Sequence, residues 1–187
     1  MFDPGTKTKL QNIHAQYAAG GNISAINLSG TYANPGLQKL IAACIHEMDA
    51  GTVTDKFVQE LAHFRRPPTE RNLEIKLKES GQKEAYYDFA IEAKEAFAKF
   101  FEVLGRHPSG QLVMIAAFSH AYSIFREKIA PNIADMSFSD QSDLFESEIV
   151  VFLSHNLTGL PGFYGRNEAL GLLFYLADNC FIEYAHV

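Results

Sequence analysis

Apolar residues along this chain recur mainly three or four positions apart, which is the period of an α-helix with one buried face. The pattern is clear in six segments: 34–50, 55–66, 82–104, the segment that follows residues 107–110 and ends near 129, 140–155, and 167 to the C-terminus. A shorter segment, 6–18, has the same period and is expected to form a seventh helix. The sequence therefore predicts an all-α bundle of six or seven helices, folded as a single domain over residues 1–187.

The segment that ends near 129 is apolar on two sides, so it is expected to lie at the centre of the bundle. Phenylalanine dominates the predicted core, since the chain has 15 Phe and no Trp. Two segments do not follow the helical period. Residues 73–78 alternate strictly like a strand, but they consist of helix-favouring Leu, Glu and Lys and include the i,i+4 pair Glu74 and Lys78, so both interpretations stay open. Residues 22–32 have no clear period.

Composition places the chain among globular proteins of the cell interior. It has 187 residues, of which 47% are hydrophobic and 20% charged, which excludes a disordered or fibrous protein. The first residues lack a secretory signal, and no run approaches the roughly 18 apolar residues of a membrane span. Cys44 and Cys180 each fall in an apolar helical stripe and are expected to be buried free thiols. We expect a soluble, cytoplasmic protein with no membrane contact.

Negative charge is concentrated in the last third of the chain. The net charge is −6, and residues 131–187 contain 8 acidic residues but only one basic residue, Arg166. Such a surface repels phosphate backbones, so nucleic-acid binding is not expected there. One interpretation is that acids such as Asp140 and Asp143 stabilise the start of a helix. The other is that the acidic third faces a basic protein or peptide partner.

A spacing that suits metal ligands occurs twice in the sequence. A Glu followed three residues later by a His places both side chains on one helix face, where they could bind the same ion. The pairs are Glu60 with His63 and Glu183 with His186. The first pair shares a polar face with Lys56, and the second lies at the chain end, so both are interpreted as surface residues rather than metal ligands. His120 falls in an apolar row, where it is either a core histidine bonded to a serine or carbonyl group, or a haem ligand.

No catalytic or nucleotide-binding motif is recognisable. The chain has no Gly-x-Ser-x-Gly elbow, and neither cysteine has a positive neighbour that would activate it. The glycines at 159, 162 and 165 are not followed by the Lys-Ser or Lys-Thr of a phosphate loop. We therefore expect no resident cofactor and a non-enzymatic role.

The glycine-rich loop 159–166 is nevertheless unusual, because it carries two aromatic residues and Arg166. The aromatic residues either fold back over the end of the bundle or serve as anchors for a partner. Our hypothesis is a protein-interaction module, such as an adaptor, an inhibitor or an immunity-type protein. The alternative is a helical-bundle ligand binder or oxygen-chemistry enzyme that holds haem, a di-metal centre or a lipid in its core. The predicted partner-binding residues are Asp140, Asp143, Glu146, Glu148, Phe163, Tyr164 and Arg166.

Overall fold

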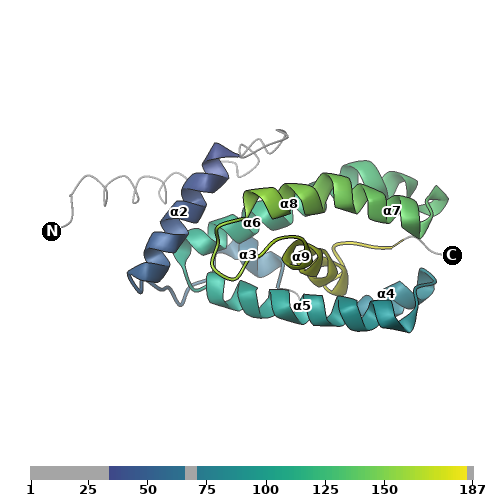
Figure 1. The fold of residues 1–187 in the computed structure, drawn as a ribbon, viewed down its shortest axis with the longest axis horizontal. Helices are drawn as coiled ribbons and strands as arrows, with labels where there is room; N and C mark the ends of the chain where they lie inside the picture. Colours follow the sequence, from purple (N-terminus) through teal and green to yellow (C-terminus); the bar gives the residue numbers. More distant parts are fainter. Residues whose placement is uncertain (1–33, 66–70, 185–187) are drawn as a thin grey trace.

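The computed structural model describes residues 34–65 and 71–184, and within them it confirms an all-α bundle without strands (Figure 1). The α-helices are α2 (Pro35–Asp49), α3 (Gln59–His63), α4 (Leu73–Glu79), α5 (Glu84–Leu104), α6 (Pro108–Ile124), α7 (Phe138–Phe145), α8 (Val151–Asn156) and α9 (Arg166–Asp178). The predictions for segments 6–18 and 22–32 lie outside the described residues, and the prediction that residues 1–187 form one domain stays a prediction.

Helices α5 and α9 pack side by side, and the rod made by α7 and α8 lies across α9 from α5 (Figure 1). Helix α6 contributes the most continuously buried surface, as its two apolar sides predict, and α2 packs across its first half. Aromatic rings fill the centre, where Phe118 of α6 stacks on Tyr175 of α9 at a centroid distance of 5.7 Å. Phe97 and Phe101 of α5 meet the same two rings. The Phe-rich core is thus confirmed.

The close contact of α5 with α9 depends on a glycine. At Gly171, an added Cβ atom would lie 2.4 Å from the carbonyl oxygen of Ala93 and 2.8 Å from the Cβ of Phe97. Both distances are shorter than atoms tolerate, so only glycine lets the two backbones approach this far. The sequence period identifies the buried face of each helix but gives no indication of this spacing.

Two interruptions of helical geometry divide the long helical segments. The segment predicted to end near 129 is α6 followed by the π-helical turn η2 (Phe125–Ile129) and the 3₁₀ turn η3 (Ala130–Asp135). The segment 140–155 is α7, the π-helical turn η4 (Glu146–Val150) and α8, which together span 138–156. A π-helical turn is wider than an α-helical turn because its hydrogen bonds reach one residue further.

Residues 73–78 are helical, which settles the two interpretations of this segment in favour of α4. Asn72 caps the helix by accepting a hydrogen bond from the backbone N–H of Ile75 at 3.1 Å. Lys78 pairs with Glu74 across one turn at 2.5 Å. Local helix preference and side-chain pairing therefore outweigh the strand-like alternation.

The predicted helix 55–66 was too long, because only Gln59–His63 is helical among its described residues, 55–65. Gln111 explains the late start: its side chain accepts from the backbone N–H of Val58 at 2.8 Å and donates to the carbonyl oxygen of Lys56 at 2.8 Å. These bonds hold 55–58 outside the helix. Phe57, which the helical period of this segment would place on the buried side, is 37% exposed and lies beneath the guanidinium of Arg65.

The prediction of one helix from 167 to the C-terminus was also wrong in its second half. Helix α9 ends at Asp178, and residues 179–184 continue without regular structure as a segment that we call the C-terminal strap. Phe181, Ile182 and Tyr184 of the strap are all at most 6% exposed. Cys180 has a φ of 60° and is exposed, contrary to the prediction that it is buried, because the strap no longer follows the helical period.

A fully buried lysine holds the C-terminal strap in place. The Nζ atom of Lys76 donates to the carbonyl oxygens of Ala177 at 2.6 Å and Ile182 at 3.1 Å, and it lies 3.0 Å from a carboxylate oxygen of Glu183. The Lys76 side chain is 0% exposed. Because each of its partners belongs to the end of α9 or to the strap, this lysine fixes the path of the last described residues over α4.

Candidate functional site

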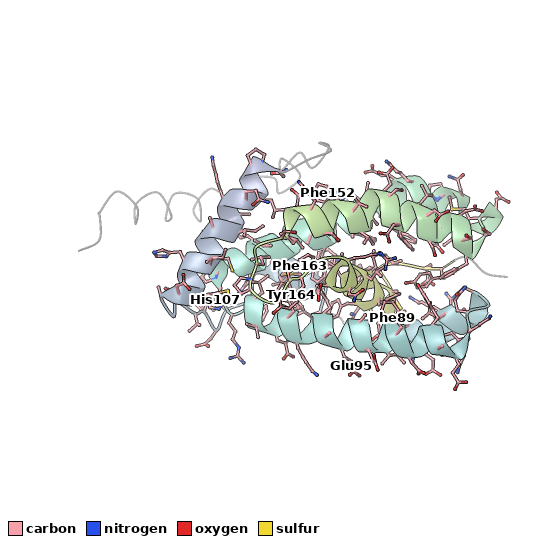
Figure 2. All side chains as sticks on the ribbon, viewed as in Figure 1. Phe89, Glu95, His107, Phe152, Phe163 and Tyr164 are labelled. Atoms are coloured by element: carbon pink, nitrogen blue, oxygen red, sulfur yellow. The ribbon has the colours of Figure 1, made fainter. Side chains whose placement is uncertain are left out.

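The loop 159–166 gives its two aromatic side chains different surroundings. Phe163 is 4% exposed and packs against Phe100 of α5 at a ring distance of 5.9 Å. Tyr164, the next residue of the loop, is 88% exposed (Figure 2). Phe163 thus follows the interpretation in which an aromatic residue folds back onto the bundle, and it holds the loop while Tyr164 is presented to solvent.

The end of this loop is joined to the rod of α7 and α8 by an ion pair. Arg166 directs its Nε toward one carboxylate oxygen of Glu146 at 3.0 Å and its Nη2 toward the other at 2.9 Å. Such two-point geometry fixes the orientation of both side chains. Gly165 precedes Arg166 with a φ of 135°, a backbone conformation that side-chain-bearing residues rarely adopt, and this turn lets α9 begin directly below the loop. The structure therefore brings together Glu146, Arg166 and Tyr164 from the predicted set.

The other predicted acidic residues have different surroundings. Asp140 forms a capping box with Ser137 at the start of α7, and hydrogen bonds from Ser137 lower the pKa of the Asp140 carboxyl. Asp143 is exposed on α7, three residues before Glu146. Glu148 pairs with Lys128 at 2.7 Å and so faces the end of α6 rather than the loop. The capping interpretation thus holds for Asp140.

Folding pairs much of the acidic third with cations from the preceding part of the chain. Asp178 is paired with Lys94 at 2.9 Å, and Glu183 is paired with both Arg71 and Lys76 at 3.0 Å. Within residues 34–65 and 71–184, four acids of the last third have no ion pair with a cation: Asp135, Asp140, Asp143 and Glu168. Within the last third, the negative charge without a counter-ion therefore lies before and along α7 and at the start of α9.

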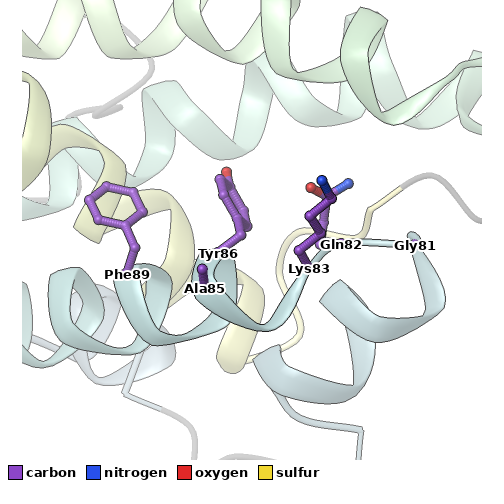
Figure 3. A pocket seen from close by; sticks show the side chains of 6 residues that line it. All are labelled: Gly81, Gln82, Lys83, Ala85, Tyr86 and Phe89. Atoms are coloured by element: carbon purple, nitrogen blue, oxygen red, sulfur yellow. The ribbon is translucent and has the colours of Figure 1, made fainter.

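Sequence reasoning missed a pocket between α5, α7 and α9, beside the Glu146–Arg166 pair. It has a volume of about 130 Å³ and is lined mainly by aromatic and leucine side chains, with Ser142, Glu146 and Arg166 among its polar lining residues. Its aromatic walls include Tyr86 and Phe89 of α5, which also line an open groove of about 490 Å³ along residues 81–89 (Figure 3). The helical period assigns both aromatic residues to the core and gives no sign of a space beside them.

Two tyrosines, Tyr86 and Tyr184, are among the residues that line this pocket. Tyr184 of the C-terminal strap is 4% exposed, and burial raises the pKa of its hydroxyl well above the ordinary value, with a further contribution from neighbouring Tyr86. Burial also raises the pKa of Tyr86, while the positive charge of Arg166 opposes that rise. Both phenols are therefore held in the neutral form, which donates a hydrogen bond.

The residues of the two Glu-x-x-His pairs do not form a metal-binding group among the described residues. Glu60 and His63 are exposed on the short helix α3, as predicted. Glu183 is outside any helix and ion-paired, and His186 lies outside the described residues. In the part of the chain that the structure describes, no three His, Cys, Asp or Glu side chains are grouped to hold a metal ion.

His120 is half-buried rather than fully buried. Its Nε2 lies 3.2 Å from the carbonyl oxygen of Glu148, and its ring packs against Phe152 at a centroid distance of 4.0 Å. Burial lowers the pKa of this imidazole. These contacts match the interpretation of His120 as a packing residue bonded to a carbonyl group.

The two cysteines have different reactivity. Cys44 is buried as predicted, and burial together with nearby Glu47 raises the pKa of its thiol to about 12. A thiol with such a pKa is not a nucleophile at neutral pH. Cys180 is exposed on the C-terminal strap and is not part of a disulfide, and its Sγ lies 3.7 Å from the carbonyl oxygen of Arg71.

Comparison with known protein families gives a match over the second part of the chain. A sequence model of the family described as C-terminal domain 9 (CTD9) of the ABC-three component (ABC-3C) systems matches residues 72–184, which is more than half of the chain. The match begins at the residue that caps α4 and ends at Tyr184, so it includes the whole pocket and the loop 159–166. No curated protein and no solved structure matches the chain. Within the described ranges, no helix is long and apolar enough to span a bilayer.

Proposed function

The chain belongs to the family of C-terminal domain 9 of the ABC-three component systems, and we propose that it is the protein-contact module through which one component of such a system binds another. The family name describes an assembly of three components, which supports a role in protein association. In this proposal the module is non-enzymatic and acts in the cytoplasm. Its contact face consists of Tyr164, the Glu146–Arg166 pair, Asp140 and Asp143.

The exposure of Tyr164 is the observation that carries this proposal. A tyrosine that is 88% exposed leaves a large apolar ring in water, yet its loop is held firmly by the buried ring of Phe163. Tyrosine and arginine are the residues that most often contribute large shares of binding energy at protein interfaces. A preorganised loop also binds with a smaller loss of conformational entropy than a mobile loop.

The charge around this face favours a basic partner. Asp140 and Asp143 carry no described counter-ion, and Glu146 supplies a further carboxylate beside them. Complementary charge mainly raises the association rate, and at 0.1 M salt it is screened beyond about 10 Å. We therefore expect association to slow as salt concentration rises. The proposed contact face is smaller than the set of partner-binding residues predicted from the sequence. It leaves out Phe163, which is buried, and Glu148, which faces the end of α6.

The test is binding of the full chain to each of the other two components of its system, measured by surface plasmon resonance. Tyr164→Ala should raise the dissociation rate roughly 10- to 100-fold, the range of a dominant interface residue. Val53→Ala is the matched control, because Val53 is also a large exposed apolar residue, at 61% exposure, but lies between α2 and α3. The proposal is wrong if neither component binds, or if Tyr164→Ala dissociates at the wild-type rate.

Asp143→Lys tests the charge of the partner. This position is chosen because Asp140 caps α7 and Glu146 pairs with Arg166, so changing either would also perturb the fold. The variant should slow association at low salt, and its rate should converge on the wild-type rate at high salt. An unchanged association rate at low salt contradicts a basic partner.

A further inference from the structure

The pocket beside the Glu146–Arg166 pair has polar groups that the fold itself does not use. Tyr184 lines the pocket and is only 4% exposed, whereas Tyr86 is half-buried. Among the described residues, neither hydroxyl makes a hydrogen bond, and neither oxygen is completely enclosed by the fold. A hydroxyl group gains stability when it is hydrogen-bonded. Both hydroxyls are therefore available to a ligand in the pocket that carries a hydrogen-bonding atom.

The size and walls of the pocket limit the ligand to one ring. Its volume is about 130 Å³, close to the roughly 150 Å³ of an engineered cavity that accommodates one benzene molecule. Sites for whole drug-sized molecules are larger, about 300 to 1,000 Å³. The lining includes the aromatic rings of Phe89, Phe174 and Tyr184, and such walls favour an aromatic ligand packed edge-to-face.

The surroundings of the pocket indicate where that ring comes from. The open groove along residues 81–89 shares Tyr86 and Phe89 with the pocket, so a polypeptide could lie in the groove with one side chain inserted (Figure 3). Glu146 and Arg166 line the pocket and also belong to the proposed contact face. The pocket is thus continuous with that face.

We propose that this pocket is the socket for one aromatic side chain with a hydrogen-bonding ring atom, such as tyrosine, which projects from a basic segment of the partner protein. The inserted hydroxyl exchanges hydrogen bonds with Tyr184 and Tyr86. The ring fills the space between Phe89 and Phe174. This inference rests on the proposed function, since it names the chemistry by which the partner is recognised.

The first experiment uses p-cresol, the side chain of tyrosine, as the probe and toluene, the side chain of phenylalanine, as its matched control. Binding to the full chain is followed by NMR of the Leu170 and Leu173 methyl groups, which line the pocket. We expect p-cresol to shift these signals at millimolar concentration and to bind about five- to tenfold more tightly than toluene, because of its hydroxyl. Tyr184→Phe should bring the affinity for p-cresol toward that for toluene and leave toluene binding unchanged. Equal affinities in the wild-type protein would overturn the proposal.

A second pair of variants tests whether the pocket serves the partner. Ser142→Leu fills the pocket from α7, whereas Ser147→Leu makes the same change at an exposed position in η4. Ser142→Leu should abolish the p-cresol shifts and weaken partner binding at least tenfold, and Ser147→Leu should do neither. In the wild-type complex, p-cresol should no longer reach Leu170 and Leu173.

The two proposals fail in different ways. If the wild-type chain binds neither component, the proposed function fails. If the complex forms and loses affinity with Tyr164→Ala, but Ser142→Leu binds the partner normally or p-cresol still enters the pocket of the complex, only the socket proposal fails. Persistent p-cresol binding in the complex would identify a site for a free aromatic compound instead.

Discussion

Replacement of Lys76 by methionine tests how much the C-terminal strap contributes to the fold. Methionine has nearly the volume of lysine and leaves the packing around the 0% exposed side chain largely intact, so the change removes mainly the ammonium group. That group makes hydrogen bonds of 2.6 and 3.1 Å to the carbonyl oxygens of Ala177 and Ile182 and an ion pair of 3.0 Å with Glu183.

The expected loss of stability depends on which partners of the Lys76 ammonium group are left without any other hydrogen bond or ion pair. Removal of one member of a buried ion pair costs about 3–5 kcal/mol when the other charge is left alone. Here Glu183 keeps its pair with Arg71 at 3.0 Å, and the carbonyl oxygen of Ala177 still accepts from the backbone N–H of Cys180 at 3.1 Å. Only the carbonyl oxygen of Ile182 loses its described partner, and methionine avoids the cost of burying a charge. We therefore expect a smaller loss, about 2–4 kcal/mol.

The assay is thermal unfolding followed by circular dichroism. A loss of this size should lower the melting temperature by roughly 4–16 °C in a domain of this length. Lys78→Met is the matched control, because Lys78 lies on the same helix with an exposed i,i+4 pair, and its replacement should leave the melting temperature nearly unchanged. Hydrogen exchange should also become faster in residues 179–184. A Lys76→Met protein as stable as wild type would refute the assignment of Lys76 as the residue that holds the strap.

Three further predictions concern the core, the thiols and pH. Gly171→Ala should lower the melting temperature, because overpacking against Ala93 costs about 1–3 kcal/mol, more than the gain of up to about 1 kcal/mol in helix propensity. Ala96→Gly, at an exposed position of α5, measures the helix-propensity difference separately. A higher melting temperature of Gly171→Ala would contradict the close contact. Iodoacetamide at neutral pH should alkylate Cys180 and spare Cys44, whose pKa of about 12 keeps its thiol protonated, and mass spectrometry that finds Cys44 modified in the folded protein would disprove this. Burial lowers the pKa of His120 below its unfolded value near 6.5, so on acidification the unfolded state binds the proton first. The contribution of neutral His120 to the free energy of unfolding is therefore fully present above pH 6.5 and is lost as the pH falls. His120→Gln should reduce the dependence of this free energy on pH below 6.5, and an unchanged dependence would argue against the role of His120.

The helices could be predicted from the sequence because their signals are local. The period of three and four identifies α2, α5 and α6, and the capping residue Asn72 supports α4, since each depends on residues within one or two turns. The C-terminal strap could not be predicted in this way. Its apolar residues Phe181 and Tyr184 are three positions apart, so they continue the helical pattern although the chain has left the helix.

The candidate site was only partly predictable. The loop 159–166 could be identified from its composition, because it combines glycines with two aromatic residues and Arg166. The structure adds that Tyr164 is exposed and that Arg166 forms an ion pair with Glu146. The paired state of Glu148 and Asp178 was not predictable, because their cations stand 20 and 84 positions away in the chain. The pocket was missed because a period shows which face of α5 is buried, but not whether the facing helices fill the space beside Tyr86.

The π-helical turns at 125–129 and 146–150 also determine where related sequences can differ in length. A π-helical turn is an α-helix that contains one additional residue, so deletion of a single residue there restores ordinary helical geometry, whereas the same deletion elsewhere in α6 or α7 rotates every following side chain by about 100°. Relatives of this chain should therefore show one-residue gaps within these two turns more often than elsewhere in the same helical segments. A gap at 146–150 would alter the local backbone that places the carbonyl oxygen of Glu148 beside His120, but it would leave the buried face of α8 directed at the bundle. The two turns thus mark positions at which the family can change the length of a helical segment by one residue without changing which side chains are buried.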